Sequence, residues 1–186
     1  MCRFFAQIST VPRSASAGLV GDCNALVEQA RRHSDGWGIG VIRGDTTLIR
    51  KSSQAAFADP DFGQVSRNLR SGALIAHIRK ATVGDVRERN AHPFSCGRWL
   101  FAHNGSIFGF EQLRDRVDAH TAHDLCGKIQ GTTDSEAIFH YLLTALREVR
   151  QPCHGRGPVD PVIASDAIRR AIGRLFQWSE AVGLEP

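Results

Sequence analysis

The chain has 186 residues, 42% of them hydrophobic and 23% charged, a composition typical of a single folded globular domain spanning residues 1–186. Basic residues exceed acidic ones by 23 to 19, but they are dispersed, so we expect a solvated surface and no nucleic-acid binding. No apolar stretch of about eighteen residues is present, which argues against a membrane span or a secretion signal, and five widely spaced cysteines without a CxxC pair favour the reducing cytoplasm.

The first half of the chain predicts strands and short helices in alternation. The apolar run at residues 2–10 predicts a buried strand, and residues 22–32 have helical spacing. Residues 33–52, punctuated by glycines around an Arg-Gly-Asp turn, predict a β-hairpin. Residues 59–71 then predict a helix with one apolar face, formed by Phe62, Val65 and Leu69.

The second half begins with two strand-like runs, at residues 72–82 and 98–105, and continues with helices. Thr133 and Glu136 fit a capping box at the start of a helix. Its predicted apolar face consists of Ile138, Tyr141, Leu142, Ala145, Leu146 and Val149. After a loop rich in helix breakers at residues 150–161, a last helix is expected to bury Ile168, Ala171, Ile172, Leu175 and Val182. Helices together with hairpin-like strand pairs predict an α+β fold.

Polar clusters interrupt the apolar pattern at Cys2 and in "HIRKATVG", "NAHPF", "AHNG" and "TTDSE". Hydrolysis of an amide on an amino acid needs a nucleophile with a base, donors for the oxyanion, and charges for the α-carboxylate and α-ammonium. If Met1 is removed, Cys2 supplies a thiol and an α-amine whose reference pKa near 8 suits a general base. Asn104 and Gly105 offer an oxyanion donor pair, Arg79 can hold a carboxylate bidentately, and Asp134 can hold an ammonium.

These segments resemble the class-II glutamine amidotransferases, whose nucleophile is an N-terminal cysteine. The resemblance is closest to small stand-alone members that begin Met-Cys-Arg and carry His-x-Asp-Gly-Trp-Gly. It runs from "MCRFF" through "HSDGWGIG", "AHIRKATVG", "NAHPF" and "FAHNG" to "GTTDSE". Each motif is weak alone, but together and in this order they form a strong signal.

The resemblance implies a four-layer αββα N-terminal-nucleophile hydrolase fold and a role for each matching residue. Cys2 would be the nucleophile, its α-amine the base, and Asn104 with Gly105 the oxyanion hole. The substrate-binding residues implied are Arg79 for the carboxylate, Thr82 and His92 as pocket lining, and Asp134 for the α-amino group. Glutamine would yield a glutamyl thioester and ammonia, and water would then release glutamate, with no cofactor and no metal.

Each residue also has an ordinary structural interpretation. Arg79 can be a surface ion pair, Thr82 a strand residue and His92 a turn residue before proline. Asp134 can simply stabilise a helix N-terminus, and Asn104-Gly105 is a common hairpin dipeptide. His120, His123 and Cys126 suggest zinc, but no fourth ligand follows at a familiar spacing, so a solvated helix is the better interpretation.

Two other functions remain open, and so does the fate of the ammonia. One is a γ-glutamyl amide hydrolase resembling that of ergothioneine biosynthesis, and the other is a non-catalytic glutamine-binding or regulatory module. The chain contains no recognisable acceptor domain, so the ammonia needs a separate acceptor subunit or is simply released. Relatives continue with further strands where this chain stops, so we expect an incomplete second sheet and an exposed apolar face near the last helix.

Overall fold

The computed structural model describes residues 2–149 and 159–184, which divide into two compact units. The first unit contains the residues up to Gly105 together with Gly131–Thr133. The second contains Ser106–Gln130 and the residues from Asp134 onward. Each unit is described separately below. No helix among the described residues is long and apolar enough to cross a membrane.

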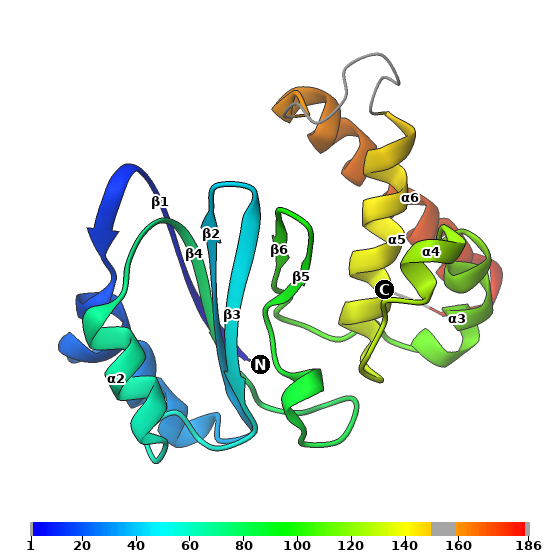
Figure 1. Ribbon diagram of the computed structural model, residues 1–186. Helices are drawn as coiled ribbons and strands as arrows, with labels where there is room; N and C mark the ends of the chain where they lie inside the picture. The colour runs from blue at the N-terminus through cyan, green and yellow to red at the C-terminus, as the bar shows by residue number, and fades with distance from the viewer. Residues whose placement is uncertain (1, 150–158, 185–186) are drawn as a thin grey trace. The chain divides into compact units, whose positions relative to one another are not determined.

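An antiparallel four-stranded sheet forms the centre of the first unit, with strand order β1-β4-β2-β3 (Figure 1). Its strands are β1 (Arg3–Ser14), β2 (Trp37–Arg43), β3 (Thr46–Ser52) and β4 (Arg70–Ile78). The predicted hairpin is confirmed, because β2 and β3 pair in register from Trp37↔Ser52 to Arg43↔Thr46. Gly44 makes the turn at φ +55°, a left-handed conformation that favours glycine.

One face of this sheet is covered by short helices. They are η1 (Ala17–Gly21), α1 (Leu26–Gln29), η2 (Ala30–Arg32) and α2 (Pro60–Asn68). Alternate residues of β2 and β4, Trp37 and Ile78 among them, turn to this side and form one buried cluster with Leu19 and Phe62. The predicted helix at residues 59–71 is confirmed, and Asp59 caps it by accepting a hydrogen bond from Asp61 N.

A two-stranded sheet, β5 (Phe94–Cys96) and β6 (Trp99–Phe101), packs near β2 and β3, with η3 (Glu88–Asn90) preceding it. Glycine is required where β2 meets this layer. A Cβ built on Gly38 would lie 2.2 Å from His92 O, and one on Gly40 would lie 2.8 Å from Leu100 and Pro93 side-chain atoms. Gly38 and Gly40 of "DGWGIG" therefore serve close packing.

The first strand departs from the prediction of a buried strand. β1 pairs only with β4 and is an edge strand of the described sheet, and its side chains are half-buried or exposed, with Ile8 92% exposed. An apolar run alone does not distinguish a central strand from an edge strand. The second sheet has two strands in residues 2–149 and 159–184, and whether it is incomplete, as the sequence analysis expects, stays a prediction.

The second unit is helical, with α3 (Phe110–Ala119), α4 (His123–Cys126), α5 (Asp134–Glu148) and α6 (Pro161–Ala181). The predicted face of α5 is buried as expected, and residues 134–143 are buried on every side. Tyr141 of α5 donates a hydrogen bond to Ala171 O at 3.1 Å and accepts one from Arg174 Nε at 3.1 Å. These hydrogen bonds connect α5 to α6.

The last helix differs from its predicted buried face at Ile172. Ala171 and Leu175 are buried, but Ile172 is 39% exposed, because the buried stripe runs through Ala167, Ala171 and Leu175 and Ile172 lies one position off it. Val162, Ile163 and Phe176 are also exposed. The predicted loop at residues 150–161 lies mostly outside the described residues.

Candidate active site

Cys2 lies directly before β1, at the end of the sheet where β4 also ends. The β1–β4 register pairs Arg3 with Ile78, so Cys2 stands opposite Arg79. The half-buried Cys2 thiol contacts the main chain of Lys80: Sγ accepts from Lys80 N at 3.3 Å and donates to Lys80 O at 3.4 Å. The N–H and the carbonyl of Lys80 therefore both contact the Cys2 sulfur.

Asn104 follows β6 and reaches Cys2 across 102 positions of sequence. Its Nδ2 donates to Cys2 O at 2.8 Å. Gly105 follows directly, and a side chain there would press on the His103 ring, since a Cβ would lie 3.1 Å from Nε2. The sheet and the "HNG" segment therefore bring a thiol and a side-chain amide donor together, the combination that thioester chemistry needs.

Arg79 is 3% exposed, and three backbone carbonyls of the following loop orient its guanidinium. Nη1 donates to Asp85 O at 2.8 Å, while Nη2 donates to Val83 O at 2.6 Å and to Gly84 O at 3.2 Å. These acceptors are neutral, so they fix the direction of the fork without neutralising its charge. Thr82 lies in the same loop and is exposed.

His92 is buried between two rings. Its centroid lies 4.5 Å from that of His77 and 4.7 Å from that of Phe94, and no hydrogen-bond partner for either ring nitrogen is found in the described residues. Burial, followed by the neighbouring His77, lowers the pKa of His92 well below its ordinary value. Burial, followed by the charge of Arg79, lowers the pKa of His77 to about 3. Both imidazoles are neutral near pH 7.

His77 makes the fold sensitive to acid. The unfolded chain binds a proton on this side chain below pH of about 6.5, whereas the folded chain does not until about pH 3. The free energy of unfolding therefore falls as pH is lowered through this window, by about 2 kcal/mol between pH 7 and pH 5. We expect His77→Phe, which keeps a ring but cannot titrate, to lose less stability than wild type over this range in urea unfolding. An identical loss in both proteins would contradict the expectation.

Asp134 belongs to the second unit, where it is the first residue of α5 and is 3% exposed. Its Oδ2 accepts from Ile107 N at 2.8 Å, and its Oδ1 accepts from Ser135 N at 2.7 Å and from Ser135 Oγ at 3.1 Å. These contacts fit an anion at a helix N-terminus. Glu136 accepts a hydrogen bond from Gln130 N at 3.1 Å, and α5 starts directly after Thr133. Neither observation tests the capping box of Thr133 and Glu136, which stays a prediction.

Asp35 and Asn90 are two polar residues near Arg79 to which the sequence analysis gave no role. Asp35 Oδ2 accepts from Ala81 N at 2.8 Å, and Asp35 N donates to Arg79 O at 3.1 Å. Asp35 thus holds the main chain on both sides of Lys80, the residue that contacts the thiol. Asn90 is fully buried and binds the loop after Arg79. Asp35 lies in the motif "HSDGWG" and Asn90 in "NAHPF". Their place in these motifs is the sequence signal that could have identified them.

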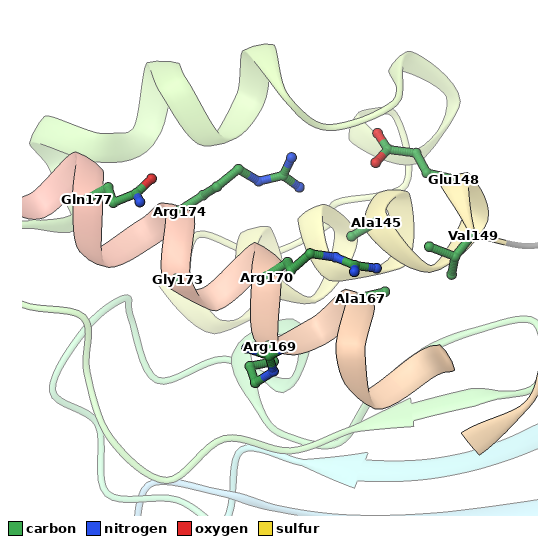
Figure 2. A pocket seen from close by; sticks show the side chains of 9 residues that line it. All are labelled: Ala145, Glu148, Val149, Ala167, Arg169, Arg170, Gly173, Arg174 and Gln177. Atoms are coloured by element: carbon green, nitrogen blue, oxygen red, sulfur yellow. The ribbon is translucent and has the colours of Figure 1, made fainter. Parts of the chain in front are cut away.

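The other candidate features lie in the second unit. His120 caps the end of α3 while His123 and Cys126 belong to α4, so the three do not share one helix. No cluster of three or more potential metal ligands occurs in the part of the chain that the structure describes. A pocket of about 500 Å³ between α5 and α6 carries Arg169, Arg170 and Arg174 (Figure 2). Its described lining includes no thiol, hydroxyl or imidazole that could act as a nucleophile.

Comparisons with known proteins identify the family of the chain. The family model described as "Glutamine amidotransferases class-II" matches residues 1–169. A probable glutamine amidotransferase of Saccharomyces cerevisiae, DUG3, is 27% identical over 198 residues, which cover 97% of this chain and 56% of that protein. The γ-glutamyl-hercynylcysteine sulfoxide hydrolase of Mycolicibacterium smegmatis is 33% identical over 118 residues, which cover 58% of this chain and 52% of the hydrolase.

A solved structure is also similar. A glutamine aminotransferase class-II domain protein of Silicibacter pomeroyi matches with a TM-score of 0.68 at 26% identity, over 97% of this chain and 66% of the other. This likeness and the mixture of strands and helices confirm the expected α+β fold class. The chain spans about half the length of the curated relatives named above. Because the family model covers most of the sequence, the chain belongs to the class-II glutamine amidotransferases.

Proposed function

We propose that both units form one glutaminase domain, which hydrolyses the side-chain amide of glutamine to glutamate and ammonia. The observation that carries the proposal is the meeting of the Cys2 thiol, the Lys80 main chain and the Asn104 amide at one end of the sheet. A thiol beside amide donors is the minimum machinery for acyl transfer through a thioester.

In the proposed mechanism, Met1 is removed and the Cys2 α-amine takes the proton of the thiol. The sulfur attacks the amide carbon, and the amide oxygen becomes an oxyanion that accepts from Asn104 Nδ2 and Gly105 N. The C–N bond breaks as the amine returns the proton to the leaving nitrogen, which departs as ammonia. Water then attacks the thioester by the same route and releases glutamate and the thiol.

The substrate's charged α-groups are assigned by charge and by family resemblance. Arg79 binds the carboxylate through its planar fork, Thr82 and His92 line the pocket, and Asp134 takes the α-ammonium. No cofactor or metal enters the scheme. A separate subunit that accepts the ammonia is also compatible with the proposal.

The test is ammonia release from a panel of γ-glutamyl amides by the mature protein. We expect glutamine to be hydrolysed with a higher kcat/KM than any other member. A preference for a bulky γ-glutamyl amide would instead favour the second candidate function. The similarity to a protein named γ-glutamyl-hercynylcysteine sulfoxide hydrolase favours that candidate. Absence of turnover on every member would reject both.

A non-catalytic glutamine-binding module is the remaining alternative, and the state of the N-terminus separates it from an enzyme. A retained Met1 would occupy the α-amine that the mechanism uses as its base. Mass spectrometry of the intact purified protein should therefore find the chain beginning at Cys2. A chain that keeps Met1 but binds glutamine without releasing ammonia would favour the binding module.

Changes at the two charged residues should act mainly on substrate binding. We expect Asp134→Ala to raise KM for glutamine by about tenfold or more, because a charge-assisted hydrogen bond is lost. Arg79→Lys should raise KM as well, since an ammonium cannot reproduce the planar fork. Steady-state ammonia assays check both variants, with Arg43→Lys at the exposed β2–β3 turn as a control. Unchanged kinetics would leave Asp134 as a helix N-terminal residue only.

A further inference from the structure

We propose that Asn90 is a positioning residue for Arg79, and that it sets how strongly the site selects substrates carrying an α-carboxylate. The inference rests on the proposed function of Arg79. Asn90 touches neither the Cys2 thiol nor the Arg79 guanidinium. It acts through the loop that connects Arg79 to Asn90. All the contacts that carry it lie within the first unit.

Asn90 is fully buried, and both the nitrogen and the oxygen of its side-chain amide form hydrogen bonds. Nδ2 donates to Asp85 O at 3.1 Å, to Asp85 Oδ1 at 2.6 Å and to Thr132 Oγ1 at 3.3 Å. Oδ1 accepts from Thr132 N at 2.9 Å. Only a side chain with a donor and an acceptor at its tip satisfies this set, which explains an amide at a buried position.

The loop that Asn90 holds is the loop that orients Arg79. Asp85 O accepts from Asn90 Nδ2 and also from Arg79 Nη1, so one carbonyl connects the buried amide to the guanidinium. Gly84, whose carbonyl accepts from Arg79 Nη2, has φ +72°, and a Cβ there would lie 3.1 Å from Asn90 Nδ2 and 3.0 Å from Thr132 Oγ1. The left-handed conformation of Gly84 and its close packing restrict the loop to one conformation.

The charges around Asp85 support the same arrangement. Its carboxylate pairs with Arg87 at 2.6 Å and with Arg89 at 3.6 Å, and the hydrogen bond from Arg87 lowers its pKa. The ionised Oδ1 is a strong acceptor for Asn90 Nδ2. If Asn90 lost its donors, the loop carbonyls would shift and the guanidinium would turn with them. A shift of about 1 Å in a positioning group is enough to impair recognition.

The experiment compares glutamine with 4-aminobutanamide, which is glutamine without its α-carboxylate. The ratio of their kcat/KM values measures selection for the carboxylate, and a general loss of folding or of nucleophile reactivity leaves this ratio unchanged. Asn90→Asp keeps the acceptor for Thr132 N, removes every donor and places a carboxylate against Asp85. We expect it to lower the ratio by about tenfold or more, in the direction of Arg79→Lys.

Two further variants keep the test interpretable. Thr132→Val removes one acceptor at an exposed position that does not threaten folding, and we expect a smaller fall in the same ratio. Asn68→Asp makes the same substitution at the exposed end of α2 and should leave the ratio at the wild-type value. A wild-type ratio retained in both Asn90→Asp and Thr132→Val, with glutamine still hydrolysed, would overturn the inference and leave the proposed function standing.

Hydrogen–deuterium exchange gives a measurement that does not depend on turnover. Amides of residues 80–90 should exchange faster in Asn90→Asp than in wild type, while those of the β2–β3 hairpin should not change. Unchanged exchange at residues 80–90 would overturn the positioning role even if no amide substrate is hydrolysed. Failure of the wild type on every amide, with faster exchange in the variant, would support the positioning role and reject the proposed function.

Discussion

Replacing Cys2 with Ala should lower kcat/KM for glutamine by at least about a thousandfold, because loss of a nucleophile removes the covalent route altogether. The thermal midpoint should change little, since this half-buried side chain lies before the first strand rather than in the core. An ammonia-release assay checks the loss of activity, and a thermal melt checks the unchanged midpoint. Residual turnover near the wild-type level would place the nucleophile elsewhere.

The matched control is Cys23→Ala, which removes an exposed thiol that donates to Asp22 Oδ1. It should keep full activity. A glutamine-like diazo-ketone should label Cys2 and leave Cys23 and Cys96 unmodified, because among the cysteines that the structure describes Cys2 is the one that Asn104 contacts. Labelling of Cys23 or Cys96 with Cys2 untouched would contradict the assignment of the nucleophile.

The sequence was most informative where local pattern and packing agree. The glycines around an Arg-Gly-Asp turn predict the hairpin of β2 and β3, and two of them, Gly38 and Gly40, pack closely against His92, Pro93 and Leu100. The first strand was misjudged because its apolar residues look like those of a central strand. Whether Phe4 and Ile8 are covered depends on which strands lie beside and above them, and the sequence of one strand does not contain that information.

The candidate site was predictable as a set of residue types, but its supporting contacts were not. The motifs led to Cys2, Arg79 and Asn104, and the structure brings Asn104 to Cys2. Nothing in the sequence indicates that backbone carbonyls orient Arg79. Asp35 before Gly36 and Asn90 before Ala91 look like ordinary turn residues. Their importance comes from long-range hydrogen bonds to Ala81 and Thr132.

Replacing Asn104 with Ala should lower kcat for glutamine by about 10²–10³-fold with little change in KM, the usual cost of losing one oxyanion donor. Asn104 Nδ2 also donates to Cys2 O, so loss of activity alone would not separate oxyanion stabilisation from placement of the nucleophile. Alkylation of Cys2 by iodoacetamide forms no oxyanion, and it separates the two roles.

If Asn104 stabilises the oxyanion, the variant should alkylate Cys2 at close to the wild-type rate while glutamine turnover falls. If its main task is to hold the Cys2 main chain, alkylation and turnover should fall together, and the oxyanion role would be rejected. Asn24→Ala, at an exposed position of the same unit, should change neither rate. Asn104→Asp completes the comparison, because a carboxylate donates no hydrogen bond and repels an oxyanion, so turnover should fall at least as far as in Asn104→Ala.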